Sequence, residues 1–99
     1  MKTKLDEARE IINEVDNEMI NLFIKRMAAV SMVAEYKIEN DIPVLDSIRE
    51  SSIKERNLEI LSNKVLEKYY LTFFDGVLKS SKDYQKYLLD KFENEKKNK

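Results

Sequence analysis

The sequence has 99 residues, 42% hydrophobic and 37% charged, and its 18 basic residues almost balance its 19 acidic ones. It contains no cysteine and no histidine, which excludes disulfides and thiol nucleophiles and removes the commonest general base and metal ligand. A single glycine excludes a glycine-rich phosphate loop, and one glycine with one proline gives few turns for a multi-stranded sheet. The balanced charge disfavours nucleic-acid binding. We therefore expect a single all-α domain over residues 1–99.

A long first helix is predicted over residues 4–40. Its apolar residues recur on one face at Leu5, Ala8, Ile12, Val15, Met19, Phe23, Val30 and Val33. Such a helix is roughly 54 Å long, whereas a compact chain of this size has a radius of gyration of about 13 Å. Two shorter helices cannot cover so long a stripe, so we expect an intertwined homodimer. The alternative is a four-helix monomer in which the first helix is kinked near its middle.

A short second helix is predicted over residues 47–62. Pro43 ends the first helix, because proline disfavours helical geometry at the residue before it. Ser47, followed three residues later by Glu50, is typical of a capping box at the start of the second helix.

A third helix of medium length is predicted over residues 64–92, and the charged residues 93–99 are expected to fray. Ser81 and Gln85 fall within its apolar face, four residues apart and so one above the other. Either the helix backbone and a neighbour satisfy this hydroxyl and amide, or both face a ligand. Spacing alone leaves the two interpretations open.

Two cations, Arg26 and Lys37, fall within the apolar stripe of the first helix. They are separated by almost three turns, so they are aligned and about 16 Å apart along the axis. A lone charge there usually pairs with a carboxylate or extends to the edge, but two aligned cations favour an anion site. Arg9 lies at the stripe's edge, about 25 Å from Arg26, and could serve only a partner's pocket in an antiparallel dimer. Asp16, also near this edge, more simply forms a structural pair.

The start of the second helix adds Asp46, Arg49 and Glu50. The two acids can simply complement the helix dipole, an interpretation that is stronger for Asp46 than for the adjacent Arg49 and Glu50. Together, these cations, carboxylates and neutral donors suit a small ligand that carries more than one anionic group and a hydroxyl. No nucleophile–base pair is evident, so a catalyst built from these groups would depend on positioning and electrostatics.

The longest uncharged stretch, residues 27–34, is too short to span a bilayer. The first residues turn acidic at Asp6 and Glu7, where a signal peptide needs an apolar run. We therefore expect a cytoplasmic protein with no membrane partner.

The sequence resembles the all-helical class of chorismate mutase over about residues 5–89. The residues that carry the resemblance are Arg9, Asp16, Arg26, Lys37, Asp46, Arg49, Glu50, Ser81 and Gln85. It implies an isomerase that converts chorismate to prephenate in phenylalanine and tyrosine biosynthesis, without metal or cofactor. It also implies an intertwined homodimer with two equivalent sites.

The resemblance assigns a role to each position. Arg26 and the partner's Arg9 would hold the two substrate carboxylates, while Lys37 and Gln85 would hydrogen-bond the ether oxygen. Glu50, with Asp46 nearby, would accept from the ring hydroxyl. Arg49 and Ser81 would complete the carboxylate side.

Two alternatives remain at this point. An isochorismate-pyruvate lyase shares the fold, and a non-catalytic helical dimerisation module would use the buried charges only to set register. One departure from helical design is Gly76, which costs about 1 kcal/mol relative to alanine. Close packing is the only explanation that the sequence offers for it.

Overall fold

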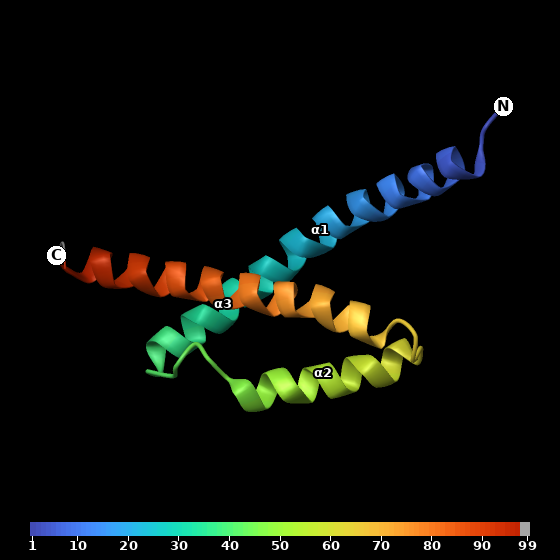
Figure 1. Ribbon diagram of the computed structural model, residues 1–99. Helices are drawn as coiled ribbons and strands as arrows, with labels where there is room; N and C mark the ends of the chain where they lie inside the picture. Colours follow the sequence, from blue (N-terminus) through green and yellow to red (C-terminus); the bar gives the residue numbers. More distant parts are fainter. Residues whose placement is uncertain (98–99) are drawn as a thin grey trace.

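The computed structural model describes residues 1–97 and has three helices, α1 (Lys4–Glu39), α2 (Ser47–Leu61) and α3 (Glu67–Lys97). The prediction of an all-α fold with one long, one short and one medium helix is confirmed. Helices α1 and α3 cross, and α2 runs beside α3 (Figure 1). The alternative of a first helix broken near its middle to give four helices is wrong, because α1 is a single helix of 36 residues.

The ends of α1 and the start of α2 follow local hydrogen bonding. Thr3 and Asp6 form a capping box at the start of α1. At its end, Asp41 is left-handed (φ 53°), and the amide of Ile42 donates to the Lys37 carbonyl at 2.9 Å, as in a Schellman motif.

The predicted capping box of Ser47 and Glu50 is wrong. Asp46 caps α2 instead, because its Oδ1 accepts a hydrogen bond from the Arg49 amide at 2.9 Å. Asp46, which the sequence analysis interprets as complementing the helix dipole, is therefore the N-cap residue.

Helix α3 begins later and ends later than predicted. Asn63 closes a turn by accepting from the Leu66 amide at 3.2 Å, which delays the helix to Glu67. The predicted fraying is wrong for residues 93–97, which belong to α3. Two lysines in the last turn complement the helix dipole there. Residues 98–99 lie outside the described chain.

The core lies where α1 crosses α3. Within residues 1–97, the buried apolar side chains are Val30 and Ala34 of α1 and Phe74 and Leu78 of α3. Ala34 is only 2% exposed, and its small side chain lets the two helices approach closely. This core is too small to stabilise a 36-residue helix along its whole length.

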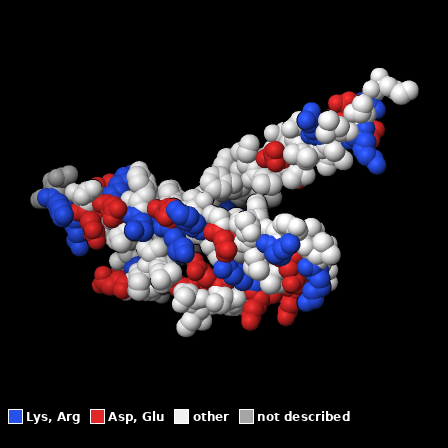
Figure 2. Space-filling view, viewed as in Figure 1, with Lys and Arg blue, Asp and Glu red and all other residues white. Residues whose placement is uncertain are grey.

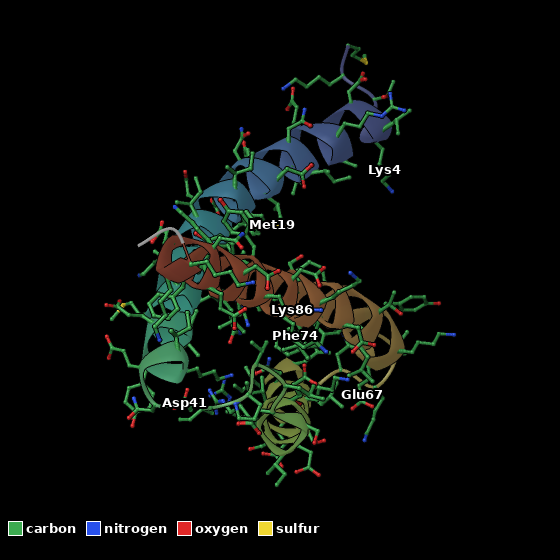
Figure 3. All side chains as sticks on the ribbon, turned by 90° about the vertical axis from the view of Figure 1, so that its left-hand side faces the viewer. Lys4, Met19, Asp41, Glu67, Phe74 and Lys86 are labelled. Atoms are coloured by element: carbon green, nitrogen blue, oxygen red, sulfur yellow. The ribbon has the colours of Figure 1, made fainter. Side chains whose placement is uncertain are left out.

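Residues 4–25 of α1, here called the N-terminal arm, project away from the other helices (Figures 1 and 3). Every residue of the arm is exposed, including the apolar side chains Leu5, Ile11, Ile12, Val15, Met19, Ile20, Leu22, Phe23 and Ile24. Figure 2 shows this surface as largely uncharged between the charged tip and the body. The arm stretches the molecule to 64 Å, with a radius of gyration of 17.9 Å.

None of the helices in residues 1–97 combines the length and apolar character needed to cross a membrane.

Candidate active site

A cavity of about 180 Å³ lies between the C-terminal half of α1, the start of α2 and the middle of α3. It brings together seven of the eight residues that the sequence predicts for ligand binding. These are Arg26, Lys37, Asp46, Arg49, Glu50, Ser81 and Gln85. Its apolar walls are Val30, Val33, Val44, Ile53 and Leu78.

Arg26 and Ser81 join the two long helices at one wall of the cavity. Arg26 Nη1 donates to Ser81 Oγ, and this hydroxyl donates to the Val77 carbonyl at 3.0 Å. Ser81 thus satisfies the helix backbone and holds the guanidinium of a neighbour, which is the first of the two sequence-based interpretations of this residue, and its contact with a ligand stays a prediction. The Arg26–Ser81 contact fixes one edge of the arginine fork and leaves its other donors for a ligand.

Lys37 links α1 to the segment that leads into α2. Its Nζ donates to the Val44 carbonyl at 2.9 Å. An ammonium carries three donors, so this bond leaves Lys37 able to donate to a ligand in the cavity. The bond also restricts the position of the ammonium at the edge of the cavity.

Gln85 is 7% exposed, and its Oε1 is buried without a hydrogen-bond partner in residues 1–97. A buried amide atom without a partner is costly, so it favours a ligand that restores the bond. Rotation of the side-chain amide by 180° exchanges its carbonyl oxygen and its NH2 group, so Gln85 can also present a donor to the cavity.

Lys37, Val44 and Gln85 also line a second cavity of about 340 Å³ beyond the first. These three side chains therefore form a wall shared by two cavities.

The start of α2 carries the carboxylates. Asp46 caps α2 and also lines the cavity. Glu50 Oε1 pairs with Lys82 Nζ of α3 at 3.1 Å. Sequence reasoning missed Lys82, although it lies three residues before Gln85 on the same helix face. Only the packing of α2 on α3 pairs it with Glu50.

Arg9 does not line the cavity and lies on the N-terminal arm. Its distance from Arg26 along one helix is about 25 Å. Asp16 is on the arm as well, outside this lining.

The lining has a positive balance. Its four cations, Arg26, Lys37, Arg49 and Lys82, exceed its two carboxylates, Asp46 and Glu50, by two formal charges. A cavity of this charge and size suits a small dianion.

Two further contacts hold α2 against α3. Lys54 Nζ pairs with Asp75 Oδ1 at 2.8 Å, and the Asn57 amide donates to the Tyr70 hydroxyl at 2.9 Å. The Asp75 carboxylate, by this hydrogen bond, raises the pKa of Lys54 above its usual value. Because no residue of α2 is buried, these polar contacts contribute to its position.

The helical fold and the cation-rich cavity between its helices define the class to which this chain belongs. Residues 8–86 match the family described as chorismate mutase type II, and the chain is a member of that family.

The curated relatives agree with this family. The chain is 32% identical to the chorismate mutase of Methanocaldococcus jannaschii, over 98% of the chain and 99% of that protein. It is 36% identical to the bifunctional chorismate mutase/prephenate dehydratase of Buchnera aphidicola subsp. Baizongia pistaciae, over 97% of the chain. It spans only 28% of that bifunctional protein and 25% of its counterpart from Buchnera aphidicola subsp. Schizaphis graminum. No solved structure matches the chain.

Proposed function

We propose that this chain catalyses the rearrangement of chorismate to prephenate in aromatic amino acid biosynthesis. The observation that carries the proposal is a cavity of about 180 Å³ with a formal excess of two positive charges, lined by residues of all three helices. Membership of the chorismate mutase type II family supports it.

The reaction suits the groups in the cavity. Chorismate is a dianion in which one carbon–oxygen bond breaks as one carbon–carbon bond forms, and no atom enters or leaves. The catalyst must hold the flexible side chain over the ring and stabilise the negative charge that grows on the ether oxygen. Neither task requires a nucleophile, a general base or a metal.

Each residue then has a proposed role. Arg26, oriented by Ser81, binds one carboxylate as a two-pronged fork, with Arg49 on the same side. Lys37 and Gln85 donate to the ether oxygen, and Glu50 accepts from the ring hydroxyl beside Asp46. Lys37 carries the charge-stabilising role, since a cation at a developing anion is stronger than a neutral donor.

We further propose that the active form is a homodimer. The chain exposes 8424 Å², whereas a compact monomer of this size exposes roughly 5,900 Å². The excess of about 2,500 Å² is on the scale that each subunit of an obligate homodimer buries. The apolar N-terminal arm is the surface that a second copy would cover.

An apolar groove of about 540 Å³ between the arm and α3 supports the same assembly. Its lining includes Met19, Phe23 and Phe73, and also Gly76, whose missing Cβ would meet nothing within 4 Å. Close packing inside the chain therefore does not explain Gly76, whereas approach of a partner helix would. In such a dimer the partner's Arg9 completes the carboxylate side of the cavity.

A direct assay tests the proposed activity. Purified chain should consume chorismate, followed by its absorbance, and yield prephenate in equal amount. Release of pyruvate from isochorismate with chorismate untouched would identify a lyase instead. A folded chain that transforms neither substrate would favour the non-catalytic dimerisation module.

A further inference from the structure

Lys82 is the one lysine of the cavity lining that comes from α3. Its ammonium lies 3.1 Å from Glu50 Oε1 on α2, and the side chains are 37% and 22% exposed. The pair therefore bridges two helices at the cavity's edge, where it is shielded from water on one side.

The Lys82–Glu50 ion pair is one of several polar contacts that join α2 to α3. Further along α2, the Lys54–Asp75 ion pair and the Asn57–Tyr70 hydrogen bond already join the same two helices. Neither of those contacts lines the cavity. The bridge from Lys82 differs from them because its acceptor is a cavity carboxylate.

We infer that Lys82 is a positioning residue that orients Glu50 toward the substrate's ring hydroxyl, an inference that rests on the proposed mutase function. A carboxylate has two oxygens, so engagement of Oε1 by Lys82 leaves Oε2 to accept from the hydroxyl. Without the ammonium, Glu50 can rotate away to water, because it lies on the first turn of a helix that has no buried residue.

Charge supports the same assignment. Glu50 shares the start of α2 with Asp46, and both carboxylates face a cavity proposed to bind a dianion. Lys82 offsets the negative charge of Glu50 locally, so the carboxylate can accept from a hydroxyl without repelling the substrate.

The test compares Lys82→Met with Asn57→Leu, which removes a hydrogen bond between the same helices outside the cavity. Lys82→Met should raise KM for chorismate about tenfold and change kcat less than about twofold, because the hydroxyl contact exists before and during reaction. Asn57→Leu should keep both constants within about twofold, and Lys82→Arg should recover most of the affinity. A purely structural role would instead lower the active fraction, and thus apparent kcat, at constant KM.

A double-variant cycle isolates the route through Glu50. In a Glu50→Gln background, the further change Lys82→Met should alter kcat/KM by less than about twofold. A full tenfold effect there would show that Lys82 acts independently of Glu50 and would overturn the inference. If wild type is active and Lys82→Met leaves KM unchanged, the inference about Lys82 is also overturned. If wild type does not act on chorismate, the proposed function itself is overturned.

Discussion

Arg26 of α1 donates a hydrogen bond to the hydroxyl of Ser81 on α3, across the crossing of the two long helices. Ser81 is 7% exposed, and its hydroxyl also donates to the backbone of its own helix. The guanidinium is therefore held by a hydroxyl that is itself fixed to the backbone of α3.

Ser81→Ala should lower kcat/KM for chorismate by about tenfold, because Arg26 loses the acceptor that orients it. Steady-state kinetics and circular dichroism measure activity and helix content in parallel. Ser52→Ala, at an exposed position of α2, is the control and should match wild type. Equal activity in the Ser81 and Ser52 variants would rule out an orienting role for this hydroxyl.

Lys37→Met should reduce kcat by at least about a hundredfold and affect KM much less, since its charge acts mainly on the developing anion. Single-turnover measurements with excess enzyme would separate the chemical step from binding. The control is Lys64→Met, whose side chain is 93% exposed between α2 and α3. A variant that loses affinity but keeps its turnover would place Lys37 on a substrate carboxylate instead.

Gln85→Glu should make the activity depend strongly on pH. When ionised, the new carboxylate repels the growing charge on the ether oxygen, and when protonated it donates a hydrogen bond as the amide does. Activity should therefore be low at about pH 7.5 and increase as the pH falls toward the usual carboxyl pKa of about 4.3. A pH–rate profile parallel to that of wild type would contradict this role.

Mixing inactive Arg9→Ala and Lys37→Ala chains, unfolding them together and refolding should restore activity. Each mixed dimer would hold one intact site, because one chain supplies Lys37 and the other Arg9. In an equal mixture about a quarter of the wild-type specific activity is expected. Confirmed exchange of subunits without recovery would exclude a site shared between chains.

The Lys54–Asp75 pair should make a small, pH-dependent contribution to stability. Because the folded-state pKa of Lys54 is raised above its usual 10.5, the contribution is present below that value and is lost at higher pH. Urea unfolding of wild type and Lys54→Met should therefore differ at about pH 8 and converge as the pH rises through the raised pKa of Lys54. A constant difference across that range would show that packing, rather than charge, is what Lys54 supplies.

Helical periodicity made much of the site predictable from the sequence. The alignment of Arg26 with Lys37 follows from their separation along one helix, as does that of Ser81 with Gln85. Each pair therefore shares a face, although spacing alone leaves open whether Ser81 and Gln85 face a ligand. The same periodicity predicted that the first helix is too long for one compact chain.

What the sequence could not supply are contacts that depend on packing. The pairing of Lys82 with Glu50 requires the register of α2 against α3, which no local pattern encodes. The choice of Asp46 over Ser47 as the cap depends on backbone geometry at the end of the connecting loop. The partner for Arg9 is a matter of assembly, and it remains a prediction.

Gln85 belongs to the wall that divides the 180 Å³ cavity from the 340 Å³ cavity beside it. Gln85 lines both cavities, so the volume of its side chain matters as much as its hydrogen bonding. Truncation to alanine would join the two spaces and admit water next to Lys37, raising the local dielectric constant. The resulting loss of rate would then exceed the value of a single hydrogen bond, and Gln85→Met would be the milder change.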